Sequence, residues 1–322
     1  MIKPTVIFAG TPEFALKSLA ALVESGVVPV AVLTQPDRPA GRGKRITASP
    51  VKEFATQQGI AVMQPLTLRD ETVVAELVAL QADFIIVAAY GLILPQEVLD
   101  IPLHGCLNVH ASLLPRWRGA APIQAAILSG DASTGISLMA MTAGLDSGPV
   151  YCSASITIEE NETAGELHER LAALGGGLLV ESLDALTAGR MSASDQDEEQ
   201  ATYAGKIQKQ DARLDWALSA DDLQRRVRAY NPEPGAFFFL NDAAIGGARG
   251  HDNLRVKCWV ARAVADIHAP PGTVVECSSD VLLIACGNGG LQLDSVQLPG
   301  KQRIKAQELV AQIDLRGKRL PA

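Results

Sequence analysis

The feature that most constrains the fold is an unbroken apolar run after Asp83, extending from Phe84 to Ala89. A strand with one face in solvent alternates apolar and polar residues, so this run predicts a strand buried on both faces. A second buried strand is expected at 5–9, followed by a helix that ends near Ser25 and a strand at 28–33. This strand–helix–strand unit predicts a parallel sheet and an α/β fold.

Capping residues place the helices of this part. Thr11 is predicted as the N-cap of the first helix with Pro12 at its first position, and Ser49 begins a second helix by the same logic. Thr163 to Glu166 fits a capping box that opens a long amphipathic helix reaching Leu186. The glycines at 175–177 weaken that helix in isolation, so a close packing contact is expected there. Further strands are expected at 60–63 and 135–141, and further helices at 69–80 and 119–129.

The length of 322 residues predicts two domains, and a hydrophobic content of 48% is enough for two cores. The segment 189–202 is polar and acidic and is the best candidate linker. Short apolar runs separated by turn signals follow it and predict a small β-barrel. The predicted division is a catalytic domain at 1–189, a linker at 190–208 and a second domain at 209–322. The barrel strands are expected near 236–240, 254–262, 272–277, 280–286 and 291–298, with helices at 219–230 and 305–313.

Composition excludes several classes of protein. The net charge of −8 and a pI near 5.2 argue against general nucleic-acid binding, so RNA contact requires local basic patches. The five cysteines are scattered and contain no C-x-x-C pair, which indicates neither a zinc site nor a disulfide framework. No apolar run has membrane-spanning length and no signal peptide is recognised, so a cytoplasmic protein is expected.

A candidate catalytic group is formed by Asn108, His110 and Asp146. Asn108 and His110 stand two apart in an apolar strand, so their side chains leave it on one face. Asp146 follows in a turn bounded by Gly144 and Gly148. Amide, imidazole and carboxylate together can polarise a carbonyl group and move a proton. Taken singly, a lone histidine is more often structural, and an aspartate beside glycines is usually a turn former.

A second candidate site is the polar segment 35–47, which is too long for an ordinary crossover. Its prolines and glycines predict that it has no regular structure. From Asp37 to Lys52 the chain has five basic side chains against one carboxylate, a net charge of +4. On charge alone, a solvated mobile loop and a phosphate-contacting arm are equally good interpretations.

Longer motifs decide between these interpretations. The pattern N-x-H-x-S-x-L-P-x-[WY]-R-G followed by G-x-D-x-G, with the stretches SLLPRWRGAAPIQ and TQPDRPAGRGKRITASPVK, resembles the formyltetrahydrofolate-dependent formyltransferases over nearly the whole chain. The resemblance implies a Rossmann-like domain followed by an OB-like β-barrel. It implies 10-formyltetrahydrofolate as co-substrate, no metal, and initiator methionyl-tRNA as the acceptor. A monomer is expected.

The resemblance also assigns residues. It makes Asn108, His110 and Asp146 catalytic, and the chemistry of a carboxylate allows Asp146 to hold the His110 tautomer. The residues expected to line the folate site are Ser112, Leu113, Leu114, Pro115, Ala88, Ala89, Tyr90 and Gly91. The residues expected to bind tRNA are Arg38, Arg42, Lys44 and Arg45. The chain departs from the family at Glu233, where a tryptophan is usual, and in the segment 241–253.

Four alternatives remain. Within the family, the acceptor would be a sugar nucleotide or a purine precursor, although a small amine needs neither the basic segment nor a barrel domain. A metal hydrolase would use His104, His110 and Asp146, but the spacing of the histidines is poor. An NAD-linked oxidoreductase would need the G-x-G-x-x-G glycines, which are missing after the first strand. A non-catalytic RNA-binding protein leaves the intact Asn108–His110–Asp146 group unexplained.

Overall fold

The computed structural model describes residues 3–40, 45–241, 253–311, 313 and 315–321. The atypical segment 241–253 lies almost wholly outside the described residues. The chain forms two compact units. The first comprises Met1–Pro122, Ser133–Thr157 and His168–Gly205, and the second Ile123–Ala132, Ile158–Leu167 and Lys206–Ala322. The domain limits inferred from the sequence stay a prediction; by contacts, residues 190–205 belong to the first unit.

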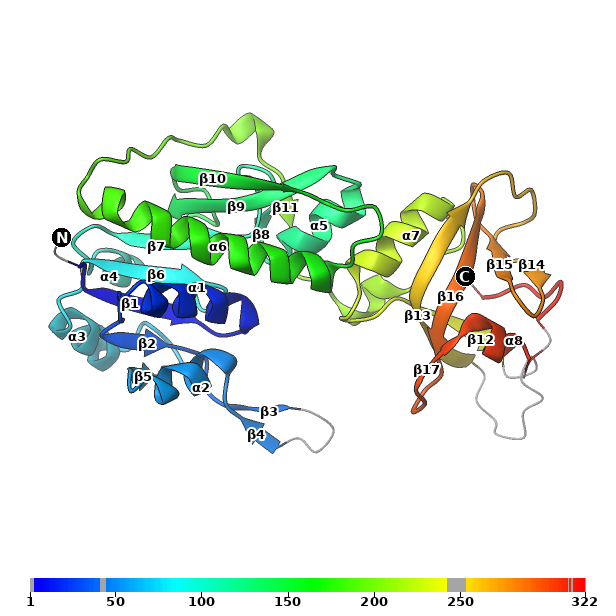
Figure 1. Cartoon of the computed structure of the whole chain (residues 1–322), viewed down its shortest axis with the longest axis horizontal. Coiled ribbons are helices and arrows are strands. Elements are labelled where there is room, and N and C mark those ends of the chain that lie inside the picture. The colour runs from blue at the N-terminus through cyan, green and yellow to red at the C-terminus, as the bar shows by residue number, and fades with distance from the viewer. Residues whose placement is uncertain (1–2, 41–44, 242–252, 312, 314, 322) are drawn as a thin grey trace. The chain divides into compact units, whose positions relative to one another are not determined.

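The first unit is built on a seven-stranded sheet with the order β10-β9-β7-β6-β1-β2-β5 (Figure 1). Neighbouring strands from β7 to β5 are parallel, whereas β9 runs antiparallel to both β7 and β10. Strands β1 and β6 are buried along their whole length, as the apolar runs predict. The strands are β1 (Val6–Gly10), β2 (Ala31–Leu33), β5 (Ala61–Met63), β6 (Phe84–Ala88), β7 (Cys106–His110), β9 (Ser133–Ala140) and β10 (Val150–Thr157).

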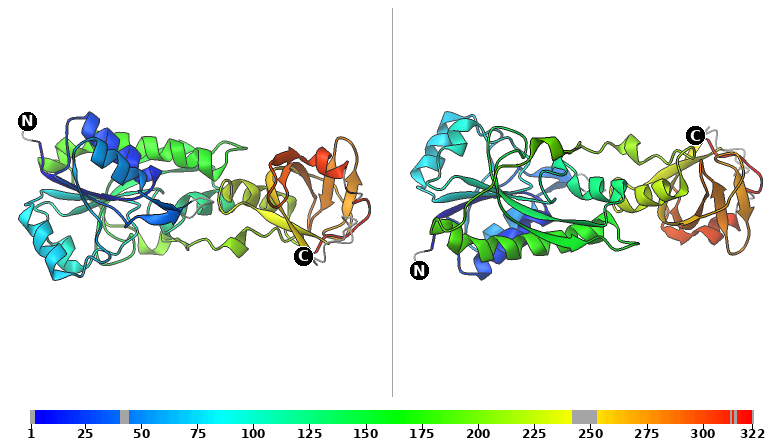
Figure 2. Two further views of the ribbon diagram at one scale, coloured as in Figure 1. Left: turned by 90° about the horizontal axis from the view of Figure 1, so that it is seen from below. Right: turned by 90° about the horizontal axis from the view of Figure 1, so that it is seen from above.

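Helices cover both faces of this sheet (Figure 2). Helices α3 and α4 bury Leu77, Val98 and Leu99 in one apolar cluster with β1 and β6. On the other face α6 crosses α1 so closely that a Cβ at Gly176 would lie 3.0 Å from the carbonyl oxygen of Lys17. The close contact predicted for the glycines of α6 is therefore confirmed. The helices of the first unit are α1 (Glu13–Glu24), α2 (Pro50–Gln57), α3 (Glu71–Ala79), α4 (Gln96–Leu99) and, apart from its first turn, α6 (Ala164–Thr187), whereas α5 (Pro122–Ser129) belongs from Ile123 on to the second unit.

The predicted N-cap of the first helix is wrong. The N-cap is Pro12, which forms no side-chain cap. The hydroxyl of Thr11 instead donates to the carbonyl oxygen of Tyr90 at 3.0 Å and accepts the backbone N–H of Gln35 at 3.2 Å. These bonds tie together the segments that follow β1, β2 and β6. By contrast, Ser49 caps α2 as expected, since its hydroxyl accepts the N–H of Lys52.

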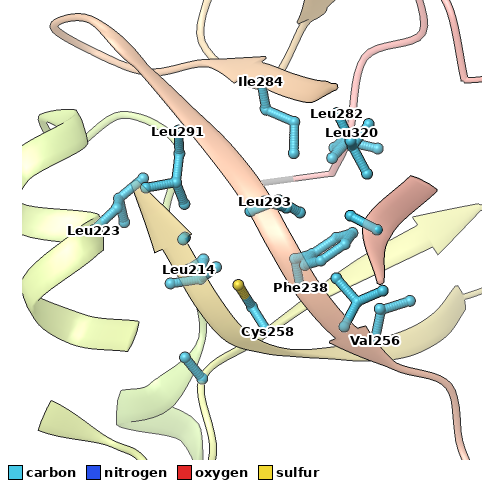
Figure 3. Packing of buried hydrophobic residues seen from close by; sticks show 14 of the residues in the cluster. Leu214, Leu223, Phe238, Val256, Cys258, Leu282, Ile284, Leu291, Leu293 and Leu320 are labelled. Carbon is cyan, nitrogen blue, oxygen red and sulfur yellow. The ribbon is translucent and has the colours of Figure 1, made fainter. Parts of the chain in front are cut away.

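The second unit contains a curled antiparallel sheet of the order β12-β13-β16-β15-β14, with β17 paired to β16, which forms a half-barrel. One face of the sheet packs a continuous apolar core that includes Phe238, Val256 and Cys258 (Figure 3). The predicted fold class, a Rossmann-like sheet followed by a small β domain, is confirmed. The elements are η2 (Lys209–Ala212), α7 (Ala220–Ala229), β12 (Phe237–Asn241), β13 (Asn253–Val264), β14 (Val274–Cys277), β15 (Leu282–Ala285), β16 (Gly290–Gln297), β17 (Arg303–Lys305) and α8 (Ala306–Val310).

Candidate functional site

The structure brings Asn108, His110 and Asp146 together. Asn108 and His110 project from one face of β7, and β9 runs antiparallel beside them. The end of β9 therefore lies next to the start of β7, and the loop 141–149 carries Asp146 back to the two side chains. The side-chain amide of Asn108 donates to Oδ1 of Asp146 at 3.3 Å.

His110 is buried, and both of its ring nitrogens face a polar group. Its Nε2 lies 3.0 Å from the carbonyl oxygen of Trp117, and its Nδ1 lies 3.7 Å from Oδ2 of Asp146. Because a carbonyl oxygen only accepts hydrogen bonds, Nε2 carries the proton in this contact. The carbonyl of Trp117, rather than Asp146, thus fixes the tautomer of the neutral ring. Nδ1 is left with a lone pair that faces the carboxylate of Asp146.

The carboxylate of Asp146 is held from two sides. Besides the amide of Asn108, it accepts the backbone N–H of Gly119 at 2.8 Å. The Asp146 backbone has φ +46°, a left-handed conformation that is uncommon for residues other than glycine, although aspartate adopts it more readily than most. The hydrogen bonds to its carboxylate make the turn a built feature of the site.

The predicted folate segment 112–115 is a tightly bonded turn. The Ser112 hydroxyl donates to the carbonyl of Arg116 at 2.6 Å, so it is already engaged within the turn. Ser137 on β9 donates to the carbonyl of Ser112 at 2.8 Å and accepts the N–H of Leu114 at 3.0 Å. The segment offers a ligand a fixed shape, and Ser137 is a supporting residue that the sequence pattern did not single out.

The other predicted folate segment, 88–91, follows β6. Ala88 and Tyr90 are buried, whereas Ala89 and Gly91 are exposed and both have positive φ. The Tyr90 ring packs in the core beneath α3 and α4, and burial raises the pKa of its hydroxyl. Only Ala89 and Gly91 thus present surface to a ligand.

A cavity of about 810 Å³ lies next to this segment and was not anticipated from the sequence. Leu94, Ile93 and Ala143 give it apolar walls, and its lining also contains the charged residues Arg69, Glu71 and Glu97. Ile93 is 84% exposed, although it is a large apolar side chain. The cavity is flanked by the loop that follows β6 and by the loop that carries Asp146.

The basic segment is more regular than predicted. Its described parts form an antiparallel hairpin of β3 (Arg38–Ala40) and β4 (Arg45–Thr47), so the expected absence of regular structure is wrong. Arg42 and Lys44 lie outside the described residues. Arg38 and Arg45 are exposed.

The base of this hairpin is fixed by a polar network. The ammonium of Lys52 lies 2.7 Å from Asp37, and Gln64 bonds to both side chains. The hydrogen bond from Lys52 holds the pKa of the Asp37 carboxyl below its usual range. Lys52 and Asp37 neutralise each other, so the remaining positive charge of the segment comes from the hairpin itself.

A second basic surface, named the basic face, lies on the outer side of the half-barrel and comprises Arg255, Lys257 and Arg303 with Phe237 and Trp259. The guanidinium of Arg255 stacks 3.7 Å from the ring centroid of Phe237. Lys257 and Arg303 lie 5.0 Å and 3.7 Å from the centroid of Trp259. Desolvation, followed by the charge of Arg255, lowers the pKa of Lys257.

Register explains why these residues share one face. Phe237 pairs with Lys257, Lys257 with Gln297, and Gln297 with Arg303, so one row crosses β12, β13, β16 and β17. Directly paired residues lie on the same side of a sheet. Their neighbours Phe238 and Val256 point into the core (Figure 3), and Phe237 is itself buried and belongs to the same apolar cluster.

His104 does not join the site. It precedes β7 and its ring stacks on Phe84 with centroids 5.1 Å apart, whereas His110 ends the same strand. Strand β7 lies between the two histidines, and the four residue steps from Cys106 to His110 alone span about 13 Å. A metal site that uses both is therefore incompatible with the geometry of the sheet.

Family models match both parts of the chain. The model described as formyl transferase matches residues 3–183, and the model for the formyl transferase C-terminal domain matches residues 206–313. The protein named methionyl-tRNA formyltransferase from Methylococcus capsulatus is 48% identical over 98% of this chain and 99% of its own length. The protein of that name from Stutzerimonas stutzeri is 49% identical over 92% of this chain and 90% of its own length.

Solved structures share the fold at low sequence identity. The N-formyltransferase of Helicobacter canadensis in complex with folinic acid and dTDP-3-aminofucose has a TM-score of 0.65 at 17% identity, covering 91% of this chain and 99% of its own. HypX of Aquifex aeolicus in complex with tetrahydrofolic acid has a TM-score of 0.59 at 17% identity and covers 96% of this chain and 47% of its own.

Proposed function

The chain belongs to the formyl transferase family, and on that premise we propose that it formylates the methionine of initiator methionyl-tRNA. The formyl donor is 10-formyltetrahydrofolate, and the product is formylmethionyl-tRNA for translation initiation. The observation that carries the proposal is near full-length identity of 48% to a methionyl-tRNA formyltransferase, combined with the convergence of Asn108, His110 and Asp146.

Formyl transfer needs stabilisation of an oxyanion. The methionine amine attacks the formyl carbon, and negative charge develops on the formyl oxygen in the tetrahedral intermediate. The side-chain amide of Asn108 has two N–H groups, of which one is bonded to Asp146. The second N–H of Asn108 donates to the oxyanion.

The reaction also moves one proton from the amine to the folate nitrogen that leaves. In the proposed route Nδ1 of His110 accepts the amine proton, since this nitrogen holds the free lone pair of the ring. The Asp146 carboxylate, 3.7 Å away, stabilises the imidazolium. His110 then returns the proton to the folate nitrogen as the carbon–nitrogen bond breaks. No nucleophilic side chain is required.

The folate binds in the first unit, in the cavity walled by Leu94, Ile93 and Ala143, of which the first two follow shortly after the segment 88–91 in the chain. The apolar walls suit a flat ring system, and the cavity size falls in the range of small-molecule sites. Ala89 and Gly91 contribute backbone to this site, whereas Ser112 and Tyr90 support it from within the fold.

Reduced folate is expected to stabilise the chain against thermal unfolding. A ligand that binds only the native state at 100 times its Kd adds about 2.7 kcal/mol. Differential scanning calorimetry with 5-formyltetrahydrofolate, and separately with NAD, measures this effect. A shift produced by NAD but not by the folate contradicts the site and restores the dinucleotide interpretation.

We further propose that the tRNA contacts both basic surfaces. Arg38, Arg42, Lys44 and Arg45 belong to the hairpin segment, which approaches the acceptor end. In the part of the second unit that the structure describes, no carboxylate forms an ion pair with Arg255, Lys257 or Arg303. Aromatic rings hold these cations in place without neutralising them, which suits contact with phosphate groups.

Replacing Arg303 by glutamine is expected to weaken tRNA binding about threefold to tenfold. The slope of the logarithm of the binding constant against the logarithm of the salt concentration is expected to fall in magnitude by about one, the value for one lost phosphate contact. Arg262→Gln is the matched control, because Arg262 lies on β13 of the same sheet but is bonded to Asp294 at 2.7 and 3.0 Å. Binding isotherms at several salt concentrations measure both variants. Equal effects of the two substitutions exclude the basic face as a tRNA contact.

The proposal includes a cytoplasmic monomer. Where the structure is described, none of the helices combines the length and apolar character needed to cross a membrane. The function itself is tested by incubating the chain with 10-formyltetrahydrofolate and charged initiator tRNA and identifying formylmethionine after hydrolysis of the ester.

A further inference from the structure

The segment 194–205, named the strap, has the composition of a linker but is hydrogen-bonded along the first unit. At one end Ser194 forms an antiparallel bridge with Val150, with N–O distances of 2.8 and 2.9 Å. At the other end β11 (Tyr203–Ala204) pairs in parallel with β8 (Arg118–Gly119). A turn of 3₁₀ helix, η1 (Glu198–Gln200), lies between them.

The strap reaches the catalytic turn through Gln196. The side-chain amide of Gln196 donates to the carbonyl oxygen of Asp146 at 2.8 Å and to that of Gly148 at 2.7 Å. These two bonds attach Gln196 to the backbone of the turn in which Asp146 adopts φ +46°. Aspartate tolerates this conformation better than most residues, and the bonds from Gln196 to the carbonyl groups of Asp146 and Gly148 favour it over the alternatives.

The same strap also sets the other contact of Asp146. The N–H that its carboxylate accepts belongs to Gly119, which pairs with Ala204. Gly119 has φ +112°, and a Cβ there would lie 2.7 Å from the carbonyl oxygen of Ala204. The backbone of Asp146 and its carboxylate are thus both positioned by groups attached to the strap.

The side chain of Gln196 is itself held in place by Arg118. Its Oε1 accepts the Nε–H of Arg118 at 3.0 Å, and the guanidinium of Arg118 forms two bonds of 2.8 Å with the carboxylate of Glu198. Arg118 is 1% exposed, so this ion pair is anchored in the fold. The amide of Gln196 therefore has one acceptor bond that orients it and two donor bonds that act on the turn.

We infer that Gln196 is a positioning residue for Asp146, and that the strap sets the geometry of the carboxylate beside His110. The inference rests on the proposed function, because it concerns the role of Asp146 in formyl transfer. It assigns a part in turnover to a segment whose local sequence is that of a linker.

Two substitutions of Gln196 distinguish its acceptor bond from its two donor bonds. Gln196→Met removes all three bonds at similar volume, whereas Gln196→Glu keeps the acceptor for Arg118 and removes both donors. Misplacement of a catalytic group by about 1 Å lowers turnover on the order of 100-fold. Both variants are expected to lower kcat about 10- to 100-fold at unchanged KM for folate and tRNA. Asp197→Ala is the control, since Asp197 bonds only to Glu199 and Gln200 in the strap and is expected to leave kcat unchanged.

A second comparison separates positioning from general loosening of the fold. In an Asp146→Ala chain, measured under single-turnover conditions, Gln196→Met is expected to lower the remaining rate less than threefold, because the group it positions is gone. Four results overturn the inference. Two concern Gln196→Met: an equal loss of rate with and without Asp146, and a kcat within threefold of that of the unsubstituted chain. The other two results are a rise in KM in place of a fall in kcat, and a Gln196→Glu chain that keeps its rate.

Hydrogen exchange provides a readout that does not depend on turnover. The peptide covering 143–149 is expected to exchange at least about tenfold faster in Gln196→Met, with the peptides of β1 and β6 unchanged. Unchanged exchange at 143–149 overturns the inference. If the unsubstituted chain does not formylate methionyl-tRNA at all, the proposed function is contradicted instead. In that case the exchange rates still test whether Gln196 stabilises the turn 143–149.

Discussion

His110→Ala is expected to lower formyl transfer by about 100- to 10,000-fold, the range typical for loss of a general acid–base group. The buried ring accepts the amine proton at Nδ1, and no other imidazole of the described chain lies beside Asp146 to replace it. Steady-state and single-turnover rates on initiator methionyl-tRNA measure the loss, and folate binding and the unfolding midpoint show that the chain remains folded.

His104→Ala is the matched control for this experiment. His104 lies in the turn just before β7, at the opposite end of that strand from His110, and its ring stacks on Phe84. Its removal affects packing but leaves the site intact, so turnover should stay within twofold to threefold. Comparable losses in the two histidine variants contradict the assignment of His110, and His110→Asn provides a variant with a smaller cavity in case the alanine substitution unfolds the chain.

Asp146→Asn is expected to lower turnover about 100- to 1000-fold, the size usual for loss of one preorganised electrostatic contact. The carboxylate accepts hydrogen bonds from Gly119 and from Asn108 on its two oxygens. An asparagine has a single oxygen, so its amide must face one of these donors, and the negative charge 3.7 Å from Nδ1 of His110 is lost. Single-turnover rates measure the effect.

Asp184→Asn controls for the general loss of a carboxylate in the first unit, because Asp184 is exposed on α6. It should leave the rate unchanged. Wild-type turnover in a folded Asp146→Asn chain excludes the carboxylate from the proton route and leaves it as a turn former.

The sequence was most informative where one local pattern determines one element. The apolar runs of β1 and β6 had no alternation, and both strands are buried. The capping box at Thr163 and Glu166 is formed, with the N–H of Thr163 donating to the Glu166 carboxylate at 2.9 Å. Asn108 and His110 share a face because side chains alternate along any strand, and that rule needs no tertiary information.

Predictions were wrong where a distant partner decides the local structure. Thr11 has the chemistry of an N-cap, but Tyr90 and Gln35 engage its hydroxyl instead. The prolines and glycines of 35–47 argued against strands, yet β3 and β4 pair across a short hairpin whose side chains are exposed and show no apolar alternation.

The strap is the clearest case of a function hidden from local pattern. Its acidic, polar residues resemble a linker because their partners are far away in the chain: Gln196 bonds across 48 to 50 positions and Glu198 across 80. Asp146, whose φ is positive, accepts one of these bonds from Gln196 at its carbonyl oxygen. Sequence periodicity reports which face of an element is buried, but not which side chain crosses to another segment.

A competition in one reaction tests the central claim most directly. The chain is mixed with formyl-labelled 10-formyltetrahydrofolate, charged initiator methionyl-tRNA and an equimolar dTDP-amino sugar, and the label in each product is counted during the first turnovers. The label is expected to enter formylmethionine, and the amino sugar is expected to stay unlabelled. Label in the sugar nucleotide with none on the tRNA contradicts the account and makes the chain a small-amine formyltransferase.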